Sequence, residues 1–129
     1  MLEMEACDMV TLKDQLEEVL TDLESVGDIR LSAIISRHGL LMVSKVAEES
    51  DSEAFAALTA TLHMSAESTT KRLSQELPKS IIVETDENSL ITHEAGPNAL
   101  IVVMASNEGG LGLILNELKK AAEKVKNLV

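Results

Sequence analysis

The chain has 129 residues, of which 45% are hydrophobic, and its formal net charge is −11 at pH 7. This length suits one domain with one core, and the apolar content argues against a disordered chain. No apolar run approaches the roughly 20 residues of a membrane-spanning helix, and an acidic chain with one Phe and neither Trp nor Tyr is a poor match for nucleic acid.

The N-terminal segment carries no export signal of the usual kind. Acidic residues occupy positions 3, 5 and 8, where a signal peptide would have a basic region followed by an apolar one. Cys7 is the only cysteine, which excludes an intrachain disulfide and a cysteine-built zinc site. We expect a cytoplasmic protein with a flexible N-terminus at residues 1–10 and a single domain at residues 11–129.

The first periodic stretch predicts a helix between residues 12 and 26. Thr11 and Asp14 have the spacing of an N-cap pair, and Gly27 suits the position after the last turn. Two β-rich runs follow, at residues 31–36 and 40–46. Gly39 lies between them and can take the positive φ of a tight turn, so we expect an antiparallel hairpin.

The longest helical pattern runs from residue 51 to residue 77 without Gly or Pro. Ser50 and Glu53 are spaced as a capping box, and Pro78 is expected to stop the helix. The face predicted to pack on a sheet contains Phe55, Leu58, Thr59, Leu62, Ala66, Thr69 and Leu73. The other side carries Ala56, Ala57, Ala60, His63 and Met64, and so much apolar surface implies a second partner.

Three further strands are expected at residues 80–85, 89–95 and 99–105, separated by turn residues. Residues 100–104 are continuously apolar, which predicts a central strand covered on both faces. A last amphipathic helix is expected at residues 110–126. The whole order predicts an α+β fold, an α/β sandwich with about five mainly antiparallel strands between helical layers.

Two segments of this order resemble the roadblock/dynein light-chain family. Residues 34–41 read I-I-S-R-H-G-L-L, similar to the family's opening strand that ends in S-R-D-G-L, with His38 in place of the usual acidic residue. Residues 107–114 read N-E-G-G-L-G-L-I and look like the segment that leads into the last helix of the family. Each motif alone is weak, but together with the element order the resemblance covers about Leu12 to Val125.

The resemblance implies a roadblock/profilin-like sandwich that forms a homodimer or heterodimer, in which the long helices pack together and the third strands meet edge to edge. It also implies that prokaryotic members bind or regulate Ras-like small GTPases, whereas eukaryotic relatives are dynein light chains or scaffold subunits. The second apolar face of the long helix and the β-prone edge at residues 81–83 fit a dimer independently. The predicted interface contains Ala56, Ala60, His63, Met64, Glu67, Ile81, Ile82 and Val83.

Candidate chemical sites are few. His63 and Glu67 are one helical turn apart, but two ligands without a third favour a hydrogen bond or dimer contact over a metal site. His38 and His93 lie apart without a nucleophile motif, and surface positions are favoured for both. We therefore predict no metal and no cofactor.

Two phosphate-directed interpretations compete with plainer ones. Gly109, Gly110 and Gly112 at a helix start suggest a phosphate cradle, but no Lys-Ser/Thr pair follows and Glu108 is repulsive, so close backbone packing is favoured. Arg37 at the hairpin tip is a possible partner contact that could act as an arginine finger, although a solvated turn residue is favoured.

The leading functional hypothesis is a noncatalytic dimeric regulator, or binding partner, of a Ras-like small GTPase. A structural adaptor is the alternative, and a small-molecule sensor is a third possibility that the nearly aromatic-free core disfavours. An enzyme is disfavoured because no catalytic constellation is visible. Acidic runs are expected to be solvated faces, or steering surfaces for a basic partner. They comprise Glu17, Glu18, Asp22 and Glu24, then Glu48, Glu49, Asp51 and Glu53, then Glu84, Asp86 and Glu87.

Overall fold

The computed structural model describes residues 10–46 and 52–129. Its elements are α2 (Leu12–Glu24), β1 (Ile29–Ser36), β2 (Leu41–Val46), α3 (Ser52–Ser74), β3 (Ser80–Glu84), β4 (Asn88–Glu94), β5 (Ala99–Ser106) and α4 (Leu111–Leu128). The predicted order of helices and strands is confirmed. Cys7, Ser50 and most of the expected flexible N-terminus lie outside the described residues.

The five strands form one antiparallel sheet in the order β2-β1-β5-β4-β3. The continuously apolar run forms β5, which is the middle strand and is buried along most of its length, as predicted. Adjacent side chains of a strand point to opposite faces, so a strand that is apolar at every position needs cover on both sides. Within the described chain, β3 pairs only with β4 and forms one edge.

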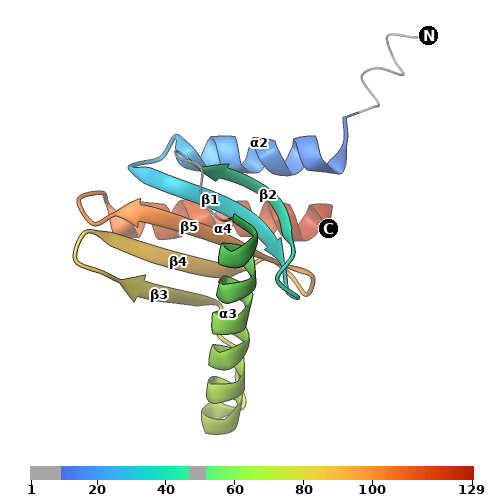
Figure 1. The fold of residues 1–129 in the computed structure, drawn as a ribbon, viewed down its shortest axis with the longest axis vertical. Coiled ribbons are helices and arrows are strands. Elements are labelled where there is room, and N and C mark those ends of the chain that lie inside the picture. Colours follow the sequence, from blue (N-terminus) through green and yellow to red (C-terminus); the bar gives the residue numbers. More distant parts are fainter. Residues whose placement is uncertain (1–9, 47–51) are drawn as a thin grey trace.

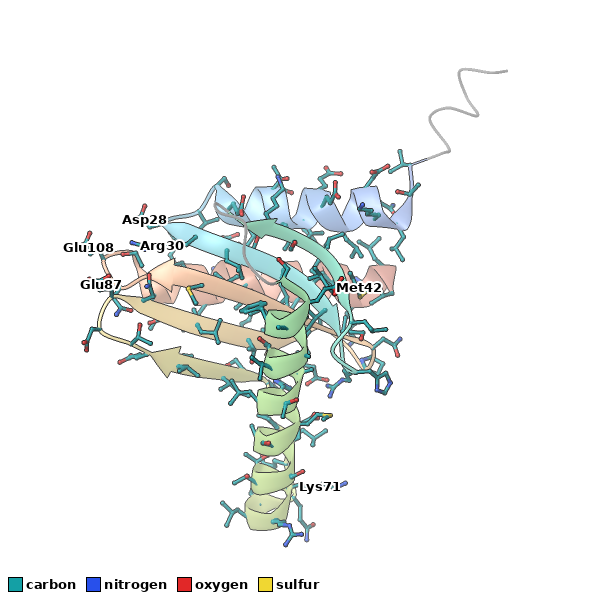
Figure 2. All side chains as sticks on the ribbon, viewed as in Figure 1. Asp28, Arg30, Met42, Lys71, Glu87 and Glu108 are labelled. Atoms are coloured by element: carbon teal, nitrogen blue, oxygen red, sulfur yellow. The ribbon has the colours of Figure 1, made fainter. Side chains whose placement is uncertain are left out.

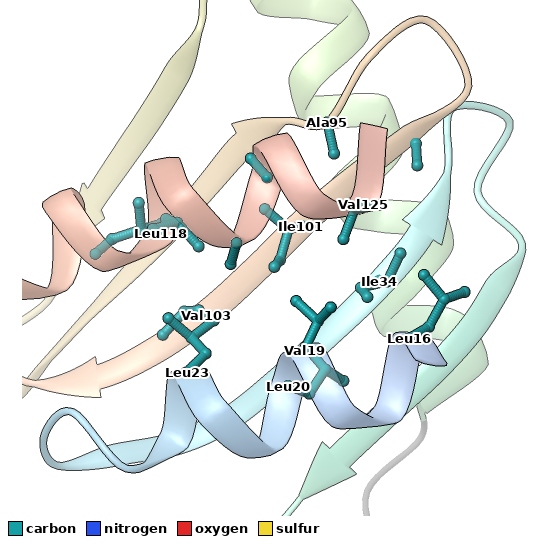
Figure 3. Close-up of a cluster of buried hydrophobic side chains, with 14 of the residues drawn as sticks. Leu16, Val19, Leu20, Leu23, Ile34, Ala95, Ile101, Val103, Leu118 and Val125 are labelled. Atoms are coloured by element: carbon teal, nitrogen blue, oxygen red, sulfur yellow. The ribbon is translucent and has the colours of Figure 1, made fainter. Parts of the chain in front are cut away.

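Helices cover both faces of the sheet, as Figure 1 shows. Helices α2 and α4 lie together on one face, where the larger core cluster forms, and α3 crosses the other face. Figure 3 shows the larger cluster, in which leucines of α2 point toward apolar side chains of β1, β5 and α4. Burial of each such leucine is worth about 1.5–3 kcal/mol. The labelled members are Leu16, Val19, Leu20, Leu23, Ile34, Ala95, Ile101, Val103, Leu118 and Val125.

Local signals fix the ends of these elements. The side chain of Thr11 accepts a hydrogen bond from the Asp14 amide at 3.1 Å, and the Asp14 carboxylate accepts one from the Thr11 amide at 3.3 Å. This is the predicted capping box of α2. Gly39 has φ +92°, as the hairpin turn requires. Helix α3 ends at Ser74, and Gln75 takes a left-handed conformation with φ 60° before Pro78 is reached.

Candidate functional site

Helix α3 packs on the sheet through its smallest side chains. Ala56, Thr59, Ala60 and His63 are its buried residues, and the apolar side chains beneath them include Ile35 and Val102. The prediction of which face of α3 meets the sheet is therefore wrong in part. Leu58 is 71% exposed and Leu73 is 83% exposed, although Thr59 is buried as expected.

Close approach of the β1–β2 hairpin explains why alanine occupies this side of α3. A Cβ atom added to Gly39 would lie 3.1 Å from the Cα atom of Ala57 and 3.5 Å from the Cβ atom of Ala60. Larger side chains do not fit at such a contact. Ala56, Ala60 and His63 thus find their partners within the protomer, and the inference that they need a second chain is wrong.

Arg37 joins three elements at this end of the molecule. Its Nη1 atom donates to both carboxylate oxygens of Glu67 on α3, at 3.0 and 2.9 Å, and its Nη2 atom lies 3.3 Å from Oε1 of Glu94 on β4. The side chain of Arg37 is only 21% exposed. The favoured interpretation as a solvated turn residue is wrong, because two carboxylates hold the guanidinium in place.

His63 lies under α3 next to this ion-pair cluster. Its Nδ1 atom is 3.4 Å from Oγ1 of Thr92, and its Nε2 atom is buried without a hydrogen-bond partner among the described residues. Burial lowers the pKa of His63, and Arg37 acts in the same direction, whereas Glu67 opposes it. Burial therefore favours the neutral imidazole, which belongs to the packing of α3.

The other sequence-predicted groups are dispersed. His63 contacts Thr92 while Glu67 binds Arg37, and within residues 10–46 and 52–129 no three His, Cys, Asp or Glu side chains are placed to hold a metal ion. His38 is exposed as predicted, whereas His93 is half-buried.

The glycines at the start of α4 are not explained by close packing. A Cβ atom at Gly112 would meet no described atom within 4 Å, and at Gly110 the nearest contact would be an ordinary 3.9 Å. The favoured packing interpretation is wrong at these two positions. Gly110 is the N-cap of α4 and supplies no side-chain hydrogen bond, so the first turn is left open.

Exposed apolar side chains lie on α3, in the segment that follows it and on both faces of the edge strand. We call this the α3–β3 surface. The C-terminal half of α3 extends past β3 in Figure 1, and Lys71 marks this projecting half in Figure 2. The members of the surface are Leu58, Met64, Leu73, Leu77, Ile82 and Val83.

The opposite end of the strands is strongly acidic. Figure 2 shows Asp28, Glu87 and Glu108 around Arg30 at the loops that end the sheet. Asp86, Glu87 and Glu108 line an open pocket there together with Arg30. Glu84, Asp86 and Glu87 are exposed, in agreement with the expectation of a solvated face, while Glu48, Glu49 and Asp51 lie outside the described residues.

Sequence reasoning missed Glu94 and Thr92, the β4 partners of Arg37 and His63. Both lie on one face of β4, at alternate positions of a strand that pairs with β5. Alternation could have placed the two on one face, but no sequence signal joins them to α3.

Known proteins resemble this chain over most of its length. Uncharacterized protein MJ1340 of Methanocaldococcus jannaschii is 26% identical over 111 residues, which cover 86% of this chain and 96% of that protein. A structure described as MglB with tetrameric arrangement superposes with a TM-score of 0.86 at 22% identity, covering 92% of this chain and 90% of its own. Gliding protein MglB of Thermus thermophilus gives 0.85 at 21% identity, with the same coverage. At these identities the two structures establish the fold.

None of the helices in the described ranges combines the length and the hydropathy that crossing a bilayer requires. A model of the Roadblock/LC7 domain family matches residues 15–105, from the first turn of α2 nearly to the end of β5. This match includes the hairpin, α3 and the three-strand meander, which together carry the Arg37 cluster and the α3–β3 surface. The chain belongs to the Roadblock/LC7 domain family.

Proposed function

We propose that this protein is a noncatalytic, dimeric regulator of a Ras-like small GTPase. Family membership supports the proposal, since prokaryotic roadblock-type proteins bind or regulate such GTPases. The observation that carries it is the α3–β3 surface, where the edge strand β3 is open and α3 exposes large apolar side chains to solvent. Such a surface is a protein-interaction site by its physical character.

The first occupant of this surface is a second copy of the chain. An edge strand can pair with the same strand of a partner across a two-fold axis, and the helices beside it then come together. Leu58, Met64, Leu73, Ile82 and Val83 are the proposed interface residues, because each is exposed in the protomer. Half-buried Ile81 and Glu67 remain predicted neighbours of this interface. The tetrameric arrangement of the MglB structure is consistent with self-association.

The GTPase then binds the assembled dimer. A regulator shifts a molecular switch only if it binds the two states of the switch with different affinity. Equal affinity for the GDP and GTP forms would leave the adaptor role. Arg37 is engaged by two carboxylates, so we expect any acceleration of hydrolysis to come from ordering of the GTPase's own switch residues.

The test begins with pull-down of the cognate GTPase, followed by titration in both nucleotide states and single-turnover hydrolysis. Arg37→Ala should keep most of any acceleration. Glu67→Gln is the matched control, because it weakens the ion pair but retains the arginine. A loss of a hundredfold or more in Arg37→Ala alone, with binding intact, would establish an arginine finger. Absence of binding in both nucleotide states would remove the GTPase proposal.

A further inference from the structure

A cavity of about 520 Å³ lies where the start of β3, the β4–β5 turn and the C-terminal half of α4 meet. Its volume is in the range of small-molecule sites. Its charged lining differs from the acidic surface elsewhere, because three lysines converge on it. The titratable residues that line it are Lys79, His93, Glu94, Lys119, Glu123 and Lys126.

Backbone contacts fix the walls of this cavity. The Glu94 amide donates to the Lys79 carbonyl at 2.8 Å, which holds Lys79 beside β4. Nδ1 of His93 lies 2.7 Å from the carbonyl oxygen of Glu94, which can only accept a hydrogen bond. Nδ1 therefore carries the hydrogen, and this bond fixes the orientation of the imidazole ring. Gly96, with φ +83°, packs on α4 so tightly that an added Cβ would lie 2.9 Å from Cγ of Lys126.

The helical wall presents three charged groups on one side of α4. Lys119, Glu123 and Lys126 follow at steps of four and three residues, so they share a face. Their neighbours Leu118, Ala122 and Val125 belong to the core, which anchors the helix beneath them. The backbone positions of the two lysines are therefore set by packing of the helix.

Positive charge dominates the cavity locally. Lys79, Lys119 and Lys126 form no ion pair with any residue of the described ranges. The Glu94 carboxylate lies 3.3 Å from Arg37, which also binds Glu67, so Glu94 and Glu123 are the two acids that oppose the three lysines. The net charge of −11 acts from farther away, and salt at about 0.15 M screens exposed charges beyond about 8 Å.

The spacing of the lysines favours an anion with more than one charged group. Seven residues separate Lys119 from Lys126, which is a rise of about 10 Å along a helix. The two flexible side chains can converge on one phosphate, but two linked phosphates offer each lysine oxygens of its own. The lining contains no aromatic side chain that would stack on a base. We propose that this cavity binds a pyrophosphate group, free or as part of a nucleoside diphosphate, without recognition of the base.

This site is independent of the GTPase proposal, so the test uses the full chain alone. Sodium pyrophosphate is titrated calorimetrically in magnesium-free buffer at about 0.15 M salt. Lys119→Ala/Lys126→Ala should weaken binding at least roughly tenfold, because two charge-assisted contacts are lost. Lys120→Ala is the matched control on the same helix outside the cavity lining and should bind normally. Glu123→Gln should bind more tightly, because it removes one of the two opposing charges.

Competing ligands separate the possible sources of the anion. GDP should bind about as well as pyrophosphate, and guanosine should not bind. Circular dichroism checks that each variant is folded, as expected for exposed side chains. Three results overturn the proposal: no binding of pyrophosphate, equal affinity of the double variant and the unmodified chain, or sulfate binding as tightly as pyrophosphate, which would indicate an adventitious ion only.

Discussion

Arg37 donates from Nη1 to both carboxylate oxygens of Glu67, at 3.0 and 2.9 Å, and this contact joins the β1–β2 hairpin to the middle of α3. The two side chains are 21% and 19% exposed, so water competes only weakly for the pair. Helix α3 continues beyond this point past the edge of the sheet. The ion pair therefore lies where the projecting half of α3 leaves its support.

Arg37→Ala should destabilise the protein by about 1–3 kcal/mol, because the Glu67 and Glu94 carboxylates lose their charged donor. The measurement is the midpoint of urea unfolding. Lys120→Ala is the control, since its contact with Glu117 is exposed and should be worth about 0–1 kcal/mol. Equal midpoints for the two variants would contradict a structural role for Arg37.

Ala60→Arg should destabilise the protomer itself. Ala60 is buried against the sheet, next to the hairpin turn, and a long charged side chain cannot be accommodated there. We expect a loss of at least about 3 kcal/mol in chemical unfolding. Ser68→Arg is the control on the exposed side of α3. If Ala60→Arg instead gave a stable monomer, the side chain would lie at the dimer contact and not on the sheet.

Most of the fold could be predicted because hydrophobic periodicity reports directly on local structure. The run at residues 100–104 predicted the central strand, and Thr11 with Asp14 predicted the start of α2. These signals depend on neighbours in sequence, which share a helical turn or a strand. The fold class and the element order followed from them.

The rotation of α3 could not be predicted by the same reasoning. Its hydrophobic residues lie around more than one side, and their three- and four-residue spacing predicted that Leu58 and Leu73 would be on the buried face. In the structure both leucines are exposed, because the close approach of Gly39 to Ala57 admits only small side chains at the contact between the hairpin and α3. The ion-pair cluster of Arg37, Glu67 and Glu94 could not be predicted either, because its residues meet only when distant segments of the chain come together.

Leu58→Asp should convert the proposed dimer into a folded monomer of 13.9 kDa. Leu58 is exposed in the protomer, so an added charge costs little until a second helix covers it. Light scattering at micromolar concentration measures the mass. Leu113→Asp on α4 is the control, exposed on the other side of the sheet. If the unmodified chain is already a monomer under these conditions, the dimer proposal fails.

Stability should fall as the pH drops below about 6.5, the ordinary pKa of histidine. Burial lowers the pKa of His63 in the folded state, so below this pH the unfolded chain binds more protons than the folded one. The contribution of His63 is therefore fully present above its unfolded pKa and is lost in acid. Glu67 and Glu94 favour the charged form, while Arg37 and His93 oppose it.

The size of this effect is measured by urea unfolding at a series of pH values between about 7 and 5. His63→Gln should flatten the slope in this range, because a neutral side chain then lies beside Thr92 at every pH. His38→Gln is the matched control, since His38 is exposed at the hairpin turn and outside the packing of α3. Identical slopes for the unmodified chain and His63→Gln would mean that carboxylates elsewhere set the acid sensitivity. A stronger slope in His63→Gln would reverse the predicted sign, because it would show that His63 gains protons more readily in the folded chain.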